Sequence, residues 1–204
     1  MSPRPQIDHI RKPQLLDAAA AVIAERGMAA TRIADIAERA GTSSAGVLYW
    51  FGSRDDLLAE ALGSAERNFH DELAAQIEPL EDPRARLATL IERSVGGDDD
   101  WVLWMEIWIL ALRDPAMSET RQRLDDGWRA QIASIVGDGQ ASGYFGGPDP
   151  ERVALELASL IDGLAVQVAL GDRLVTPELM RSTCIEVAER LLEATLPAPA
   201  EAAA

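Results

Sequence analysis

The 204-residue sequence is poor in cysteine, histidine and aromatic residues, and it contains no long apolar run. Its single cysteine, Cys184, excludes an internal disulfide and any metal cluster held by several thiolates. The two histidines, His9 and His70, form no pair at metal-binding spacing, so we expect neither a metal nor another cofactor. No stretch of about 18 apolar residues could span a membrane, and the N-terminus does not resemble a signal peptide. We therefore expect a cytoplasmic protein.

Basic residues are also scarce, because 19 Lys and Arg stand against 34 Asp and Glu, for a net charge of −15. Taken alone, this charge argues against binding to nucleic acid. The distribution is uneven, however: residues 1–54 hold seven basic and five acidic side chains, a net of +2, whereas the other 150 residues hold 12 and 29, a net of −17. The N-terminal quarter is therefore the part of the chain that can face phosphates.

The same N-terminal quarter shows the pattern of two short helices joined by a tight turn. The first helix is indicated by apolar residues at three- and four-residue steps: Ile33, Ile36, Ala37 and Ala40. Gly41 permits a left-handed backbone, and the hydroxyls that follow it can cap a second helix. We expect the second helix to bury one side and to turn the other outward, as a recognition helix does. The residues expected to be buried are Val47, Leu48 and Phe51.

Helices are expected on both sides of this pair. An apolar stripe predicts a helix from Pro13 to Arg26 that closes a three-helix core. Ser53 and Asp56 fit a capping box, which predicts a long helix from Ser53 to about Ile77. Residues 1–8 are either an arm that reaches a minor groove or a frayed terminus.

The stretch Thr31–Arg54, TRIADIAERAGTSSAGVLYWFGSR, resembles the DNA-binding domain of TetR-family transcriptional regulators. The matching positions are Ile36-Ala37, Ala40-Gly41, Ser43, Phe51, Gly52-Ser53 and Arg54. Three positions depart from the family pattern. Arg32 replaces the second threonine of a pair, Arg54 replaces a phosphate-binding lysine, and the usual tyrosine falls one residue later, as Tyr49.

The resemblance implies that residues 1–56 form a helix-turn-helix domain that binds double-stranded DNA. Ser44 and Gly46 would face the floor of the groove, and Tyr49 or Trp50 would supply the aromatic phosphate contact. The full set expected to contact phosphates or bases is Arg32, Ser43, Ser44, Gly46, Tyr49, Trp50 and Arg54. The recognition helix is poor in side chains that make bidentate base contacts, so we expect DNA shape to contribute to readout.

Residues 57–196 are expected to form a helical effector-binding and dimerisation domain. The run WVLWMEIWILALRDP, residues 101–115, is apolar on nearly every side and so predicts a central helix, with Leu112 on its tryptophan face. Two interpretations of its indoles remain open, namely core packing and the wall of a ligand cavity. In the second, the ligand would be apolar or aromatic, including a cationic one held through cation–π contact. The ligand-binding residues would be Trp104, Met105, Trp108 and Trp128.

Two further segments are interpreted from their composition. Asp98, Asp99 and Asp100 are better explained as the start of a helix than as ligands of a divalent cation. Residues 137–150 contain five glycines and two prolines, which predicts the loosest stretch outside the termini.

The last two long helices, residues 150–171 and 177–195, carry apolar surfaces wider than one neighbour can cover. We therefore expect a homodimer in which they pair with their copies as a four-helix bundle. The stretch LIDGLAVQVALGD, residues 160–172, is similar to the corresponding helix in the TetR-family branch that regulates betaine synthesis. Residues 197–204 are expected to be disordered. The predicted fold is all-α, with about nine helices.

These features favour a ligand-responsive repressor that a small-molecule effector releases from a palindromic operator. An enzyme is disfavoured because no Ser-His-Asp or Cys-His set and no phosphate loop is present. A third interpretation is a dimeric protein that sequesters a ligand or binds a non-DNA partner. The salt dependence of DNA binding separates it from the first, because a true DNA-binding protein weakens steeply as salt rises.

Overall fold

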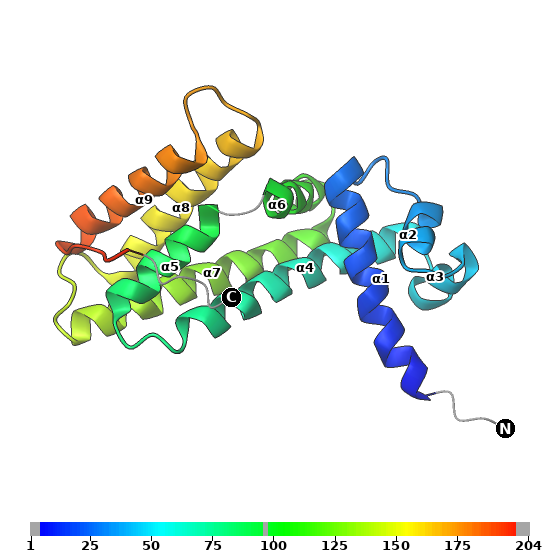
Figure 1. Cartoon of the computed structure of the whole chain (residues 1–204), viewed down its shortest axis with the longest axis horizontal. Helices are drawn as coiled ribbons and strands as arrows, with labels where there is room; N and C mark the ends of the chain where they lie inside the picture. The colour runs from blue at the N-terminus through cyan, green and yellow to red at the C-terminus, as the bar shows by residue number, and fades with distance from the viewer. Residues whose placement is uncertain (1–4, 96–97, 199–204) are drawn as a thin grey trace. The chain divides into compact units, whose positions relative to one another are not determined.

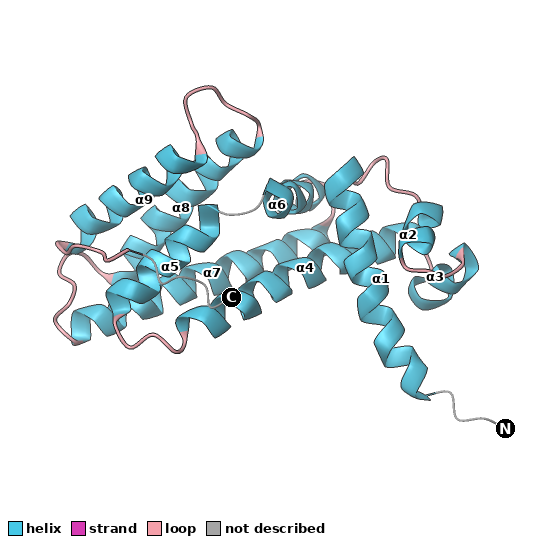
Figure 2. Cartoon of the chain, viewed as in Figure 1, coloured by secondary structure: helices cyan, strands magenta, loops and turns pink. Residues whose placement is uncertain are grey.

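The computed structural model describes the backbone of residues 5–95 and 98–198, and the side chains of those residues except 5–11, 66 and 98–100. Within these ranges the chain consists of nine helices and their loops, without strands, as the sequence predicts (Figures 1 and 2). The helices are α1 (Pro5–Arg26), α2 (Ile33–Arg39), α3 (Ser44–Phe51), α4 (Arg54–Ile77), α5 (Pro83–Val95), α6 (Asp98–Ala111), α7 (Pro115–Ala141), α8 (Pro150–Ala169) and α9 (Pro177–Leu192).

The chain forms two compact units, neither of which is a continuous stretch of sequence. Unit 1 comprises the described residues up to Phe69 together with Val102–Arg121. Unit 2 comprises His70–Trp101 and the described residues from Gln122 onward. Helices α4, α6 and α7 each contribute to both units. These packing units differ from the linear division expected after residue 56, because parts of α6 and α7 pack with the N-terminal helices.

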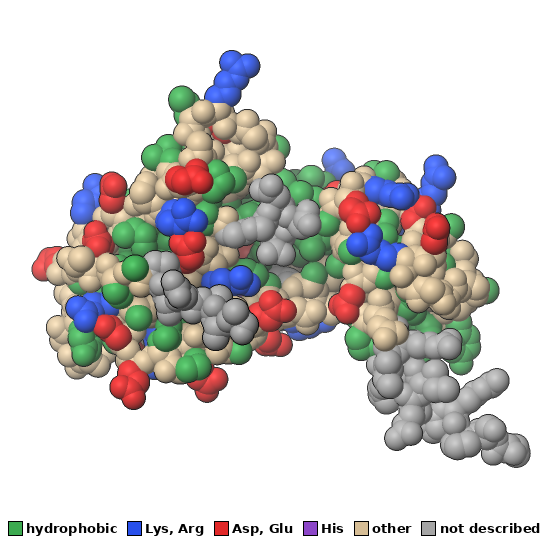
Figure 3. Space-filling view, in the orientation of Figure 1, with side chains coloured by type: hydrophobic (Ala, Val, Ile, Leu, Met, Phe, Trp, Pro, Cys, Tyr) green, Lys and Arg blue, Asp and Glu red, His purple; other side chains and the backbone are tan. Residues whose placement is uncertain are grey.

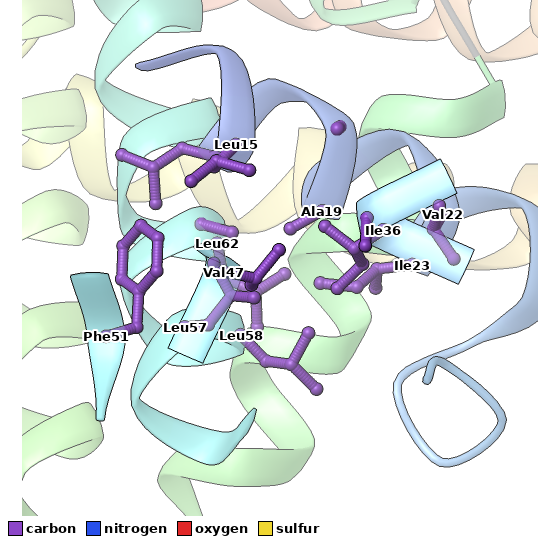
Figure 4. Close-up of a cluster of buried hydrophobic side chains, with 14 of the residues drawn as sticks. Leu15, Ala19, Val22, Ile23, Ile36, Val47, Phe51, Leu57, Leu58 and Leu62 are labelled. Carbon is purple, nitrogen blue, oxygen red and sulfur yellow. The ribbon is translucent and has the colours of Figure 1, made fainter. Parts of the chain in front are cut away.

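Unit 1 has one apolar core. Side chains of α1, α2, α3 and α4 converge in it, as Figure 4 shows for Leu15, Ile36, Val47 and Leu58. Helix α6 adds Ile107, which is 1% exposed. Burying a large aliphatic side chain stabilises a fold by about 1.5–3 kcal/mol. Burial of Ile107 therefore stabilises the packing of α6 against the N-terminal helices.

In unit 2, α8 and α9 pack against each other and against α5. Each of the three helices buries apolar side chains, among them Leu87 of α5, Leu157 of α8 and Cys184 of α9. Burial raises the pKa of the Cys184 thiol to about 11, so the thiol stays protonated at neutral pH. Arg181 of α9 binds both carboxylate oxygens of Glu92 of α5, with N···O distances of 2.5 and 2.8 Å. This bidentate pair fixes the orientation of α9 on α5.

Most predicted helix boundaries are confirmed. Thr176 caps α9 by accepting a hydrogen bond from the N–H of Leu179 at 3.2 Å, and α8 begins at Pro150. The predicted start of α1 at Pro13 is wrong, because the helix already begins at Pro5. Pro13 lies inside it and removes one backbone hydrogen bond without ending the helix. The other part of the predicted arm, residues 1–4, lies outside the described residues, as does most of the predicted tail.

The segment 137–150 is more ordered than the sequence predicts. Helix α7 continues to Ala141, and the loop after it is tied down by hydrogen bonds. Nε2 of Gln140 donates to the carbonyls of Gly146 and Pro148, at 3.1 and 2.7 Å, and the N–H of Gly146 donates to the carbonyl of Leu192 at 2.7 Å. The glycines therefore allow close packing here.

No described helix combines the length and the apolar character that crossing a membrane requires. Among the described residues, no three His, Cys, Asp or Glu side chains gather into a possible metal site. The acidic run 98–100 coincides with the start of α6, as expected.

Candidate nucleic-acid interface

The candidate interface is built on α2, α3 and the turn between them. Gly41 has a φ of +65°, a left-handed conformation that residues with a side chain rarely adopt. Ser43 then caps α3, because its Oγ accepts a hydrogen bond from the N–H of Gly46 at 3.1 Å. Val47 and Phe51 are buried in the core of unit 1. The buried side of α3 thus fixes which residues face outward, as a helix-turn-helix requires.

The outward side of α3 is centred on Tyr49, which is 82% exposed. Ser44 is exposed too, as predicted, and so is Ala45. Sequence reasoning missed Ala45, although its four-residue spacing from Tyr49 places both on one side of the helix. The predicted burial of Leu48 is wrong, since it is 40% exposed. It follows Val47 directly and so lies about 100° around the helix from it.

Trp50 and Gly46, also predicted to project outward, are only half-exposed. Trp50 packs against the core of unit 1, and its ring meets that of Tyr49 edge-on, with centroids 5.9 Å apart. A Cβ at Gly46 would lie 2.9 Å from Oγ1 of Thr42, so any larger residue there would have to displace the Thr42 side chain. Of the two aromatic candidates, Tyr49 is therefore the one that is accessible to a phosphate.

The two predicted DNA-binding arginines have different surroundings. Arg32 is the N-cap residue of α2 and is exposed. Arg54 instead turns toward the α1–α2 loop, residues 27–32. Its Nε donates to the carbonyl of Thr31 at 2.9 Å, and its Nη2 donates to the carbonyl of Met28. Arg54 thus holds this loop, a role that no sequence motif indicates because its partners are backbone carbonyls.

Ion pairs partly neutralise two other arginines of the N-terminal helices. Arg26 pairs with Asp35 at 3.0 Å, and Arg39 pairs with Glu25 at 2.5 Å. The face seen in Figure 3 accordingly mixes basic and acidic side chains over the N-terminal helices. Arg32 is consequently the strongest candidate for a charged phosphate contact.

The two α6 tryptophans of unit 1, Trp104 and Trp108, are not part of its buried core. Trp104, Met105 and Trp108 are half-buried, and the two indole centroids are 6.1 Å apart. A neighbouring face of α6 is buried through Ile107. The expectation that the helix is central is wrong for its end, because Leu112 lies just beyond the last turn and is 84% exposed.

Trp128, the fourth predicted ligand-binding residue, belongs to unit 2, whereas the other three belong to unit 1. Its side chain is 9% exposed, and its ring lies 5.8 Å from that of His70. Burial lowers the pKa of His70, an effect that the nearby Asp71 carboxylate opposes. Neutral imidazole is therefore the form that packs against this indole at neutral pH.

Asp162 of α8 is a half-buried carboxylate that sequence reasoning did not single out. Burial, and then the charge of Asp125, raise its pKa to about 6, while Arg129 opposes the shift. A carboxyl group whose surroundings make ionisation unfavourable is a candidate for a functional role. The sequence offers no local signal for it, because it depends on what surrounds the residue in the folded chain.

Two family models match the sequence. Residues 15–61 match the model described as bacterial regulatory proteins, tetR family, and this range includes α2 and α3. Residues 79–197, more than half of the chain, match the model of the BetI-type transcriptional repressor, C-terminal.

Relatives and solved structures agree with these matches. The chain is 29% identical over 176 residues to the HTH-type transcriptional regulator BetI of Rhizobium meliloti, covering 86% of each protein. A crystal structure of a transcriptional regulator from Saccharomonospora viridis in complex with choline aligns with a TM-score of 0.83 and 32% identity, over 91% of this chain and 98% of that one. A TetR transcription regulator from Haloarcula marismortui aligns with a TM-score of 0.81 and 28% identity, over 90% and 99%.

Proposed function

Since the chain belongs to the TetR family of transcriptional regulators and carries a BetI-type C-terminal domain, we propose that it is a repressor that leaves its operator when a small molecule binds. The family is one of regulators rather than of enzymes. The observation that carries the DNA-binding part is the exposed side of α3, where Tyr49 projects opposite the buried Val47 and Phe51.

In this proposal, three exposed residues of the interface make the contacts, and the residues that cap α3, form its turn or hold the neighbouring loop support them. Arg32 and Tyr49 bind phosphates, and Ser44 faces the groove floor. Ser43, Gly46 and Trp50 shape α3 and its turn. Arg54 acts on the DNA backbone indirectly, because it holds the α1–α2 loop that precedes the phosphate-binding Arg32. The contact set expected from sequence is thereby divided into groups with different roles.

We further propose that the protein acts as a homodimer. Leu155 of α8 is 52% exposed and Leu179 of α9 is 45% exposed, which supports the pairing of these two helices with the same helices of a second copy. A dimer would present two recognition helices roughly 34–36 Å apart, so the operator is expected to be a near-palindrome.

The experiment that tests DNA binding is the salt dependence of the affinity for a duplex selected by the protein from a random-sequence pool. Residues 1–54 carry a net charge of +2, so we expect about two neutralised phosphates per head, and a dimer should then lose affinity about 10²-fold between 50 and 200 mM salt. Arg32→Ala should reduce the slope of log affinity against log salt by about 2 per dimer, while Arg173→Ala, an exposed arginine of unit 2, should leave it unchanged. A flat salt profile would instead favour the ligand-sequestering alternative.

For the effector, we propose a small quaternary ammonium compound. The support is the choline bound to the similar Saccharomonospora regulator, together with the indole of Trp128 and the carboxylate of Asp162 within unit 2. An indole face and a carboxylate are the groups that attract such a cation.

Choline and its uncharged isostere 3,3-dimethyl-1-butanol form a matched pair for testing this proposal. Choline should change the tryptophan fluorescence and weaken operator affinity about 5- to 150-fold, whereas the isostere should do neither. Equal responses to both compounds would show that charge is not recognised. No response to choline would remove the proposed effector class while leaving DNA binding intact.

A further inference from the structure

The α1–α2 loop is held by side chains from two helices outside the helix-turn-helix. Met28 is bonded on both sides: its N–H donates to Oε1 of Glu106 on α6 at 2.8 Å, and its carbonyl accepts from Nη2 of Arg54 at the start of α4. The carbonyl of Thr31 accepts from Nε of Arg54 at 2.9 Å. Side chains of α4 and α6 therefore make three hydrogen bonds with the loop backbone.

The Glu106 carboxylate packs directly against the loop. A Cβ added at Gly27 would lie 3.2 Å from its Oε1, and both Gly27 and Met28 are half-buried. The next residue, Ile107, is buried in the core of unit 1 and anchors this part of α6. A hydrogen bond to a charged acceptor that is partly shielded from water is stronger than one between neutral groups. The bond thus links the position of α6 to that of the loop.

The loop leads directly into the candidate interface. Thr31 is 1% exposed, and its Oγ1 donates to the carbonyl of Gly27 at 2.9 Å, which closes the loop on itself. The following residue, Arg32, is the N-cap of α2 and the leading candidate for a phosphate contact. Because this internal bond closes the loop, we expect a displacement of Met28 to move Arg32 as well.

We propose that Glu106 is a positioning residue for DNA binding. It reaches from α6 to the Met28 amide and so fixes the α1–α2 loop and the start of α2 in the arrangement that binds the operator. The inference rests on the proposed function and goes beyond it, because it makes operator affinity depend on the position of α6 through one named hydrogen bond.

Three variants of the full chain test the role of Glu106. Glu106→Ala removes the acceptor, whereas Glu106→Gln keeps an oxygen that can accept from the Met28 N–H. Glu119→Ala, at an exposed position on α7 in the same unit, makes the same change of net charge. This control matters because losing a negative charge by itself strengthens DNA binding.

For the selected duplex, Glu106→Ala should bind about tenfold more weakly than Glu119→Ala, and Glu106→Gln should stay within about threefold of the wild type. Thermal unfolding identifies any variant that is weak only because it is unfolded. Equal affinities of the two alanine variants, or a Gln variant as weak as Glu106→Ala, would overturn the proposal.

Amide hydrogen exchange separates this proposal from the proposed function. In Glu106→Ala, the amides of residues 28–32 should exchange faster than in the wild type, and in Glu106→Gln they should not. If the wild type binds no duplex at all, the DNA-binding function fails. Unchanged exchange of the loop in Glu106→Ala would overturn the positioning role, whether or not DNA binds.

Discussion

Gly139→Ala is expected to lower the free energy of unfolding by about 3 kcal/mol. Gly139 lies near the end of α7, and a Cβ there would be 2.0 Å from Cδ2 of Phe145. Phe145 is 6% exposed, and its N–H donates to the carbonyl of Gly139 at 3.1 Å. Cγ of the ring would itself lie 2.8 Å from the added Cβ, so rotation about χ2 cannot relieve the clash, and the methyl group must displace the ring from its buried site.

Gly127→Ala in the same helix is the matched control. Gly127 is exposed and has no heavy atom within 4 Å of an added Cβ, so alanine should stabilise the helix by about 0.5–1 kcal/mol. Urea unfolding should therefore shift in opposite directions for the two variants. In a Phe145→Ala background, the penalty of Gly139→Ala should fall below about 1 kcal/mol, because the clashing ring is gone. A penalty that persists there would place its cause outside this contact.

The features that sequence reasoning predicted correctly are local ones. The turn at Gly41, the cap at Ser43 and the start of α9 at Thr176 depend on residues within a few positions of each other. The same holds for the buried side of α3, where Val47 and Phe51 lie one turn apart. Short-range hydrogen bonds and helical periodicity leave few alternatives, and for this reason the helix-turn-helix could be recognised without a structure.

The features that it missed depend on partners distant in sequence. Sequence reasoning assigned Arg54 a phosphate contact and did not find its hydrogen bonds to two carbonyls in a loop 23 and 26 residues away. Glu106 bonds an amide 78 residues away, and the glycine at 139 is required by a ring from the following loop. No local pattern encodes such pairings, because they arise only when the helices pack.

Asp162→Asn is expected to stabilise the protein at pH 8 by about 2 kcal/mol and to have little effect near pH 4. Burial raises the pKa of Asp162 to about 6, so between pH 4 and 6 the folded chain binds more protons at this site than the unfolded chain. Raising the pH through this window therefore lowers the stability of the wild type, and the loss is complete above the folded-state pKa. Asparagine cannot ionise, so the Asp162→Asn variant does not lose stability through this site as the pH rises.

Asp172→Asn provides the control of opposite sign. The Asp172 carboxylate accepts hydrogen bonds from the N–H groups of Leu174 and Val175 at 2.7 and 3.0 Å, which lower its pKa, so its substitution should destabilise slightly at pH 8. Thermal unfolding near pH 4 and at pH 8 measures both effects. A cationic effector would favour ionised Asp162, so choline should bind more tightly at pH 7 than at pH 5 in the wild type but not in Asp162→Asn. If Asp162→Asn is more stable at pH 8 yet binds choline as the wild type does, the Asp162 carboxylate does not recognise the effector.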